Sequence, residues 1–255
     1  MGKSKICVFG QDKRMQYLCK LLNQYGYEAI PISSPEEVGA CYFDHYVFPV
    51  GTDQEFLERF INNNPNSIFF VGNCSVSAPN VFDYFKDEVV TIKNTIPTAE
   101  GAIATAIYET EITLFGSQCL VLGYGKVAKT LAGYLGCFGS KVTVAARKER
   151  DRALAKICMF ETIDICELEE KIENFDIIIN TIPAKIINSD ILLKIKDDAL
   201  IIDLASKPGG VDFKEAEKLG KKVIWALGLP AKVAPKTAAR YIFEYIKGII
   251  EEREK

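Results

Sequence analysis

The sequence predicts an α/β protein made of two doubly wound domains, each with a parallel sheet. Two short apolar runs, Lys5–Phe9 and Gln118–Leu122, are each followed by glycine and then by a stretch with helical periodicity. Near-continuous apolar segments such as ALIIDLA are typical of parallel strands that helices cover on both faces. With 255 residues, of which 48% are hydrophobic, the chain can fill two cores.

The first hundred residues predict one small α/β domain. The run Lys5–Phe9 leads into a helix over Arg14–Tyr25, which Gly26 ends before the strand EAIPI. Further strands are expected at Tyr46–Val50 and Ser67–Val71. We therefore expect an N-terminal domain over residues 1–96 that binds substrate or forms a dimer.

The second half repeats this pattern over residues 97–237. Pro97 and several small residues favour a closely packed interdomain helix over residues 98–112. An amphipathic helix over residues 238–255 is expected to cross back to the first domain. The predicted strands of this half are Gln118–Leu122, Lys141–Ala145, Asp176–Asn180, Ala199–Leu204 and Lys222–Ala226.

A glycine-rich turn follows the strand QCLVL and precedes the helical run KTLAGYL. It has the GxGxxA pattern of a Rossmann dinucleotide site in its required strand-turn-helix context. Gly123 permits the tight turn, Gly125 lets a pyrophosphate approach the backbone, and Ala128 lets the helix pack closely. The sequence predicts cofactor binding by Gly123, Tyr124, Gly125, Lys126, Val127 and Ala128.

The end of the following strand indicates which dinucleotide binds. An NAD site usually has a carboxylate there for the ribose 2′-hydroxyl, but this segment reads VTVAARKER. Arg147 and Lys148 suit a 2′-phosphate, so NADP is favoured. NAD stays possible, because exposed cations after a strand are common and Glu149 weakens the case.

Two later strand ends should meet the nicotinamide half of the cofactor, because ligands bind at the carboxyl edge of such a sheet. The residues expected there are Thr181, Ile182, Pro183, Ala205 and Ser206. Lys207 follows in a loop rich in proline and glycine, and Lys232 and Lys236 flank the start of the last helix. These three cations could converge on an acidic substrate, although each alone could be an ordinary surface lysine.

Composition argues against several classes of function. A net charge of −3 gives no positive field for nucleic acid or an anionic membrane. The eight cysteines form no CxxC pair and there is a single histidine, so no metal site is expected. That histidine, His45, fits a structural role at least as well as a catalytic one. The second half has no histidine to act as the acid/base of a hydroxy-acid dehydrogenase. The N-terminus does not read as a signal segment, so a cytoplasmic protein is expected.

Several stretches resemble the family of dipicolinate synthase A subunits. They are TIPTAEGAIATAI, CLVLGYGKVAKTLA, VTVAARK, DIIINTIP, LIIDLASKPGGVDF and ALGLPAKVAPKTAA, between about residues 95 and 240. ASKPGGVDF and LGLPAKVAPKTA are the more specific of these. The first hundred residues are similar more loosely, and Gly-Gln-Asp-Lys-Arg replaces the family's Gly-Gly-Asp-x-Arg start.

The resemblance implies oxidation of dihydrodipicolinate to dipicolinate with NADP or NAD during spore maturation. It also implies that the partner is a flavoprotein-like B subunit, and a homo-oligomer is expected besides. Lys207, Lys232 and Lys236 would hold the dicarboxylate, and Thr98 and Glu100 would line the cleft between the domains. Lys207 and Glu100 are then the candidate catalytic residues, with Glu100 or water accepting a proton.

Two other functions fit the same residues. One is another two-domain NADP-dependent dehydrogenase, similar to shikimate or methylene-tetrahydrofolate dehydrogenase. The other is a non-catalytic NADP-binding subunit, which the missing histidine acid/base leaves open.

Overall fold

The computed structural model describes residues 4–34, 37 and 42–253. The chain divides into two compact units. Unit 1 combines Met1–Asn94 with Pro230–Lys255, and unit 2 is Thr95–Leu229.

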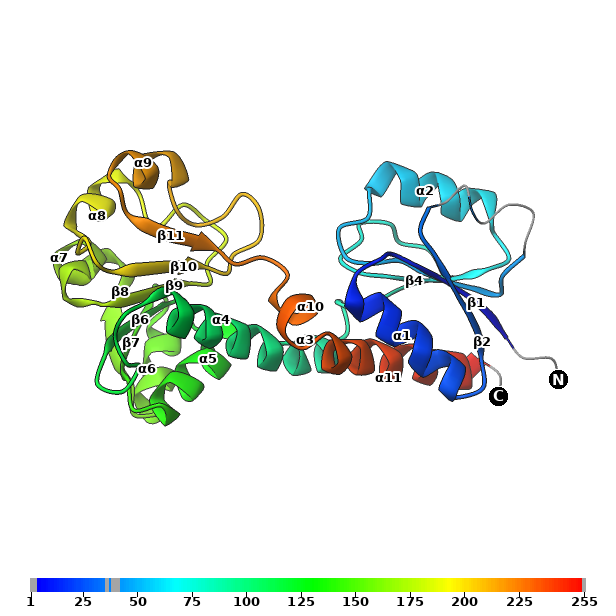
Figure 1. The fold of residues 1–255 in the computed structure, drawn as a ribbon, viewed down its shortest axis with the longest axis horizontal. Helices are drawn as coiled ribbons and strands as arrows, with labels where there is room; N and C mark the ends of the chain where they lie inside the picture. The colour runs from blue at the N-terminus through cyan, green and yellow to red at the C-terminus, as the bar shows by residue number, and fades with distance from the viewer. Residues whose placement is uncertain (1–3, 35–36, 38–41, 254–255) are drawn as a thin grey trace. The chain divides into compact units, whose positions relative to one another are not determined.

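Unit 1 is built on a five-stranded sheet in the order β2-β1-β3-β4-β5, with every pair of neighbouring strands parallel. Figure 1 labels β1, β2 and β4 of this sheet. One face is covered by the packed helices α1 and α11, and the other by α2. The elements of unit 1 are β1 (Lys5–Phe9), α1 (Lys13–Gln24), β2 (Glu28–Ile32), β3 (His45–Val47), α2 (Gln54–Asn63), β4 (Ile68–Val71), β5 (Val81–Asp83), α3 (Glu88–Lys93) and α11 (Pro235–Arg253). The short helix α10 (Leu229–Val233) spans the boundary between the units.

Local signals explain where the helices of unit 1 begin. Asp12, Asp53 and Asp87 each accept a hydrogen bond from a backbone N–H of the first turn that follows. Such caps satisfy donors that an α-helix leaves free at its start. The apolar face of α1, including Met15, Leu18 and Leu22, is fully buried together with side chains of α11.

Unit 2 contains a six-stranded parallel sheet in the order β11-β10-β9-β6-β7-β8. This is the strand order 3-2-1-4-5-6 of a Rossmann sheet read from the other edge. The elements are α4 (Thr95–Glu109), β6 (Gln118–Leu122), α5 (Lys126–Cys137), β7 (Lys141–Ala146), α6 (Glu149–Ile157), β8 (Glu161–Asp164), η2 (Ile165–Glu167), α7 (Leu168–Lys171), η3 (Ile172–Asn174), β9 (Ile177–Asn180), α8 (Ser189–Lys194), β10 (Leu200–Asp203), α9 (Phe213–Lys218) and β11 (Lys222–Trp225).

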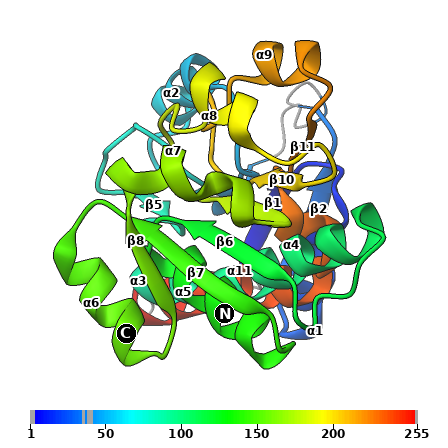
Figure 2. The same cartoon turned by 90° about the vertical axis from the view of Figure 1, so that its left-hand side faces the viewer.

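Two apolar clusters cover the two faces of this sheet. Alanine and leucine side chains of α4 and α5 pack on one face, and α7, α8 and α9 pack on the other. Figure 2 shows α5 and α7 on opposite sides of the strands. The strands β9 and β10 are buried at every position, which is why their sequences are apolar up to the last residue of each strand, Asn180 and Asp203.

The predicted fold class is confirmed: both sheets are parallel, and α11 packs on α1 of the first unit. Two strands were missed, β5 and β8, because both are short edge strands with half-exposed residues. The helix expected over 98–112 begins at Thr95 and ends at Glu109. It begins earlier because Asn94, which ends α3, already has a helical backbone conformation.

Among the described residues, no helix combines the length and the apolar character needed to cross a membrane. Within the same residues, no three His, Cys, Asp or Glu side chains are grouped closely enough to hold a metal ion.

Candidate cofactor site

The turn between β6 and α5 has the geometry that its glycines predict. Gly123 has φ +93°, and a Cβ there would lie 2.7 Å from Thr181 Oγ1. Thr181 in turn donates its hydroxyl to the Leu122 carbonyl at 2.7 Å. Gly123 is therefore required by backbone conformation and by the close approach of the neighbouring strand end.

Gly125 has a different role. It is the N-cap of α5, its φ of −78° is open to any residue, and no side chain caps the helix start. A Cβ at Gly125 would meet nothing within 4 Å. The start of this twelve-residue helix therefore has no side-chain cap and has open space at Gly125, where an anion could approach.

A cavity of about 450 Å³ lies at this turn. It is lined by residues that follow β6, β7 and β9, the central strands of the sheet. The lining residues are Gly123, Tyr124, Gly125, Ala146, Arg147, Lys148, Asp151, Ile165, Thr181, Ile182, Pro183, Ala184 and Ile186. The carboxyl edge of a parallel sheet is where dinucleotides bind in this topology, and these residues fit such a cofactor.

The cavity brings together most of the predicted cofactor residues. Lys126, Val127, Ala205 and Ser206 do not line it. Ala128 does not line it either, because it is fully buried in the core between helix and sheet. Its small size serves the packing of α5, which is the reason for its place in the motif.

The basic turn after β7 is held by a residue that sequence reasoning missed. Arg152 donates from Nη1 to the carbonyls of Ala146 (2.7 Å) and Arg147 (2.9 Å). The same atom lies 2.7 Å from Asp164 Oδ2, at the end of β8. The Cys166 backbone N–H, with Arg152, holds the pKa of Asp164 below its usual value. The exposed side chains of Arg147 and Lys148 thus extend from a fixed backbone.

Asp151 is a second lining residue that the sequence analysis did not single out. It is half-buried in the first turn of α6. A carboxylate could accept a hydrogen bond from a ribose hydroxyl, as the acidic residue of an NAD site does. The cavity therefore holds groups suited to a phosphate and one group suited to a hydroxyl.

Two fully buried polar residues link the ends of β9 and β10. Asn180 donates from Nδ2 to Asp203 Oδ1 at 2.8 Å and to the Ile182 carbonyl at 3.0 Å. Asn180 Oδ1 also accepts the Ile182 backbone N–H at 3.0 Å. The turn of Thr181–Pro183, which lines the cavity, is thereby fixed to the end of the neighbouring strand.

Asp203 fixes the following loop as well. Its Oδ1 accepts the Ala205 N–H at 3.0 Å, and its Oδ2 accepts the Gly210 N–H at 2.7 Å. Trp225 Nε1 donates to the Ala205 carbonyl at 2.9 Å. Lys207 precedes Pro208 through a cis peptide bond and is exposed on this loop. An exposed lysine on a rigid loop can hold an acidic group at a defined position.

The remaining predicted substrate residues lie in both units. In unit 2, Thr98 is half-buried and Glu100 is exposed on α4. Lys232 and Lys236 are exposed and belong to unit 1. Convergence of these two lysines on Lys207 therefore stays a prediction. His45, the single histidine, is buried as the first residue of β3.

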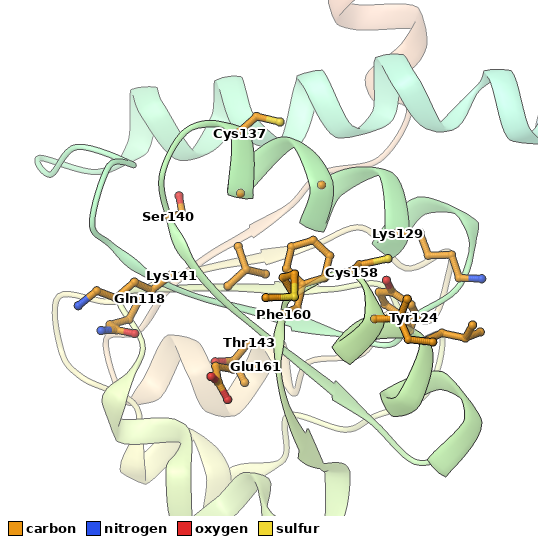
Figure 3. A pocket seen from close by; sticks show the side chains of 16 residues that line it. Gln118, Tyr124, Lys129, Cys137, Ser140, Lys141, Thr143, Cys158, Phe160 and Glu161 are labelled. Atoms are coloured by element: carbon orange, nitrogen blue, oxygen red, sulfur yellow. The ribbon is translucent and has the colours of Figure 1, made fainter.

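A larger hollow of about 1030 Å³ lies elsewhere on unit 2, beside α5, α6 and β7. Figure 3 shows its lining, with Cys158 beside Tyr124 and Cys137 farther away on α5. Burial and the neighbouring Cys158 thiol raise the pKa of Tyr124. The hollow is lined by the first half of β7 rather than by its carboxyl end, and it is mostly apolar. The smaller cavity, with its glycine turn and cations, is therefore the better dinucleotide site.

Comparison with known proteins agrees with this geometry. Residues 95–227 match the family model of the S-adenosyl-L-homocysteine hydrolase NAD-binding domain. The crystal structure of the dipicolinate synthase A chain from Bacillus subtilis is 30% identical and superposes with a TM-score of 0.82, covering 99% of this chain and 97% of that one. This chain belongs to the family of dipicolinate synthase A subunits.

Other members of the dipicolinate synthase family are similar in the same way. The protein from Bacillus halodurans is 27% identical with a TM-score of 0.86, covering 97% of this chain and 99% of that chain. The protein from B. subtilis strain 168 is 41% identical over 168 residues, which are 66% of this chain and 57% of that protein. A transhydrogenase from Sinorhizobium meliloti, at 14% identity and a TM-score of 0.70, shares the fold. Because residues 95–227 match an NAD-binding family model, unit 2 is a nicotinamide-cofactor domain.

Proposed function

We propose that the chain is the A subunit of a dipicolinate synthase, which oxidises dihydrodipicolinate to dipicolinate with NADP in the cytoplasm of a spore-forming cell. The observation that carries this proposal is membership of the family, supported over almost the whole chain by the B. subtilis structure. In this reaction the substrate loses a hydride and a proton and becomes an aromatic ring. NADP, when bound, accepts the hydride.

The residues of the cofactor cavity support the binding part of the proposal. The uncapped start of α5 would hold the pyrophosphate. Arg147 and Lys148 would hold the 2′-phosphate, since guanidinium forms charge-assisted and often bidentate bonds to phosphate. Thr181 and Pro183 would position the nicotinamide end, because Asn180 fixes their backbone.

Asp151 supports the alternative cofactor, NAD. Its half-buried carboxylate lines the same cavity and could accept a ribose 2′-hydroxyl. A 2′-phosphate close to this carboxylate would be repelled, and two cations beside it would outweigh that repulsion. NADP is therefore the proposed cofactor.

The substrate part of the proposal uses local cations, because the chain has a net charge of −3. Lys207, Lys232 and Lys236 would hold the two carboxylates, Thr98 would contact the substrate, and Glu100 or water would take the proton. Aromatisation removes no alcohol proton, which fits a second half without histidine. The proposed partners are a second copy of this chain and a flavoprotein-like B subunit.

The test uses the purified chain with NADP or NAD and dihydrodipicolinate freshly made by its synthase. Reduced cofactor is followed by its absorbance and dipicolinate by its ultraviolet band. Lys207→Ala is compared with Lys214→Ala, an exposed lysine of α9 in the same unit. The proposal is supported if the wild type and Lys214→Ala form both products and Lys207→Ala forms neither. Cofactor binding without turnover, even in the presence of the B subunit, would indicate a non-catalytic role.

A further inference from the structure

Arg14 of unit 1 is a buried cation with at least one donor that has no partner in the described part of the chain. Its side chain is 9% exposed, and its Nη2 lies 3.5 Å from Asp12 Oδ2. Its Nε is buried without a hydrogen-bond partner among the described residues. A guanidinium carries five N–H donors, and native structures rarely leave buried donors unpaired. Arg14 therefore has donors in reserve for a further acceptor.

The position of Arg14 in its helix is also electrostatically unfavourable. It lies in the first turn of α1, where the helix dipole presents partial positive charge. The first turn has no acidic residue, and Oδ1 of the N-cap Asp12 already accepts a hydrogen bond from the Met15 N–H at 3.0 Å. Asp12 is 39% exposed, so water weakens its attraction for Arg14. An anion beside Arg14 would stabilise both the buried positive charge of Arg14 and the partial positive charge at the helix start.

The topology of the sheet makes this a place for a ligand. In the order β2-β1-β3-β4-β5, the strand that follows β1 in the chain, β2, pairs with one edge of β1, and the next strand, β3, pairs with its other edge. The switch point therefore lies between β1 and β3. Ligands of open α/β sheets bind outside the carboxyl ends of the strands at such a point. The turns after β1 and β3 meet there: a Cβ on Gly10 would lie 3.2 Å from Pro49 Cγ. Arg14 follows the first of these turns.

Tyr84 is a buried residue at the same edge of the sheet, and its hydroxyl is within the electrostatic influence of Arg14. The ring is fully buried, and its hydroxyl donates to the carbonyl of Phe48, just after β3, at 2.9 Å. Its hydroxyl also lies against Gly72, just after β4. Burial raises the pKa of Tyr84, and the positive charge of Arg14 opposes that rise. The charge of Arg14 is thus felt at Tyr84, and the burial of Arg14 excludes a position on the outer, solvent-exposed face of α1.

We propose that Arg14 binds a carboxylate of the substrate at the β1–β3 switch point of unit 1. The planar fork of a guanidinium matches the two oxygens of a carboxylate, and the first N–H groups of α1 add to the favourable field. Asp12 positions Arg14 and caps the helix. The identity of the carboxylate as part of a small dicarboxylate depends on the proposed function; the anion site itself depends only on unit 1.

The test measures binding to the full chain without cofactor, by calorimetry and thermal melting. The probes are dipicolinate, its one-carboxylate analogue picolinate, and inorganic phosphate. The variants are Arg14→Met and Arg14→Lys, with Arg59→Met and Arg59→Lys as controls, since Arg59 is an exposed arginine of α2 in the same unit.

The expected result is that dipicolinate stabilises the wild type and Arg59→Met, while Arg14→Met binds it at least about tenfold more weakly. Arg14→Lys should be intermediate, because a point charge replaces the fork. Free Arg14→Met should melt at or above the wild-type temperature, since an underpaired buried charge is gone. An arginine with a purely structural role would lower the melting temperature when removed and leave the Kd unchanged.

Three outcomes would overturn the inference: an unchanged Kd in Arg14→Met, no binding of dipicolinate to the wild type, or binding of phosphate alone. If Arg14→Met does not fold, the comparison of Arg14→Lys with Arg59→Lys decides in the same way. Turnover assays separate this inference from the proposed function. If the Arg14 variants turn over substrate with an unchanged KM, the inference about Arg14 is wrong and the proposed function stands. If dipicolinate binding depends on Arg14 but no turnover occurs, the proposed function is wrong and the anion site stands.

Discussion

The side chains of Asn180 and Asp203 meet at 2.8 Å at the ends of two neighbouring strands, and both are fully buried. Asn180 holds the turn that lines the cofactor cavity, and Asp203 holds the loop that carries Lys207. Through this contact the two loops at the carboxyl edge share one hydrogen-bond network. The geometry of the site is therefore supported from beneath by residues that do not line the cavity.

Removal of the Asp203 carboxylate should destabilise both loops. Asp203→Ala leaves three buried donors without their acceptor, and we expect the free energy of unfolding to fall by about 3 kcal/mol or more. Asp198→Ala, an exposed aspartate of the same unit, should change it by less than about 0.5 kcal/mol. Denaturant unfolding followed by circular dichroism measures both. Equal stability of the two variants would contradict a structural role for Asp203.

The two glycines of the turn should separate stability from cofactor binding. Gly123→Ala places a Cβ against Thr181 at positive φ, so we expect a loss of more than about 1 kcal/mol in stability. Gly125→Ala has room and an ordinary φ, so stability should change by less than about 0.5 kcal/mol. Its methyl group would occupy the side open to phosphate, and the Kd for NADP should rise at least about tenfold. Melting curves and cofactor titration are the two measurements, and an unchanged Kd in Gly125→Ala would argue against this phosphate site.

Arg147 should discriminate between the two dinucleotides. Loss of a charge-assisted contact to a 2′-phosphate is worth about 1.5–3 kcal/mol, so Arg147→Ala should raise the Kd for NADP about tenfold to a hundredfold. The Kd for NAD should hardly change. Arg150→Ala is the control, since Arg150 is exposed in the adjacent helix and does not line the cavity. Equal weakening of both cofactors would indicate a general electrostatic effect.

Asp176 should make unit 2 sensitive to acid. Burial alone would raise its pKa, but hydrogen bonds from Lys196 Nζ (2.6 Å) and the Gln118 N–H (2.8 Å) outweigh burial and lower it. A lowered folded-state pKa stabilises the protein above the unfolded pKa of about 3.9, and this contribution is lost as pH falls through the folded value. Asp176→Asn should therefore cost about 1–2 kcal/mol at pH 7 and less as pH falls below about 4. Urea unfolding across this range tests it, and a pH-independent difference would contradict it.

Much of the fold could be predicted from local patterns. Strands buried on both faces, such as β9 and β10, can be predicted from their nearly continuous apolar runs. Amphipathic helices such as α1 can be predicted from their periodicity. The strand β8 did not, since an edge strand with polar residues resembles a loop. The glycine turn could be predicted because its requirements, a tight bend and a close approach, apply to adjacent residues.

The supporting residues of the site could not be predicted in this way. Arg152 reads as one more charge on a helix, and only the fold brings it to the Ala146 carbonyl and to Asp164. Asp151 likewise follows a basic run in which no single position stands out. Neither residue belongs to a pattern that the cofactor itself requires.

The sequence by itself determined two parallel α/β halves, a glycine turn suited to a pyrophosphate, and a second strand that ends in cations instead of a carboxylate. The tertiary structure alone decided that Asn180 meets Asp203, that Arg152 fixes the basic turn, and that Arg14 is buried with its Nε unpaired among the described residues. The reason is that periodicity and turn chemistry act between near neighbours in the chain. Hydrogen bonds between strand ends, and the burial of a charge, depend on the order of strands in a sheet. That order brings into contact residues that are far apart in the sequence.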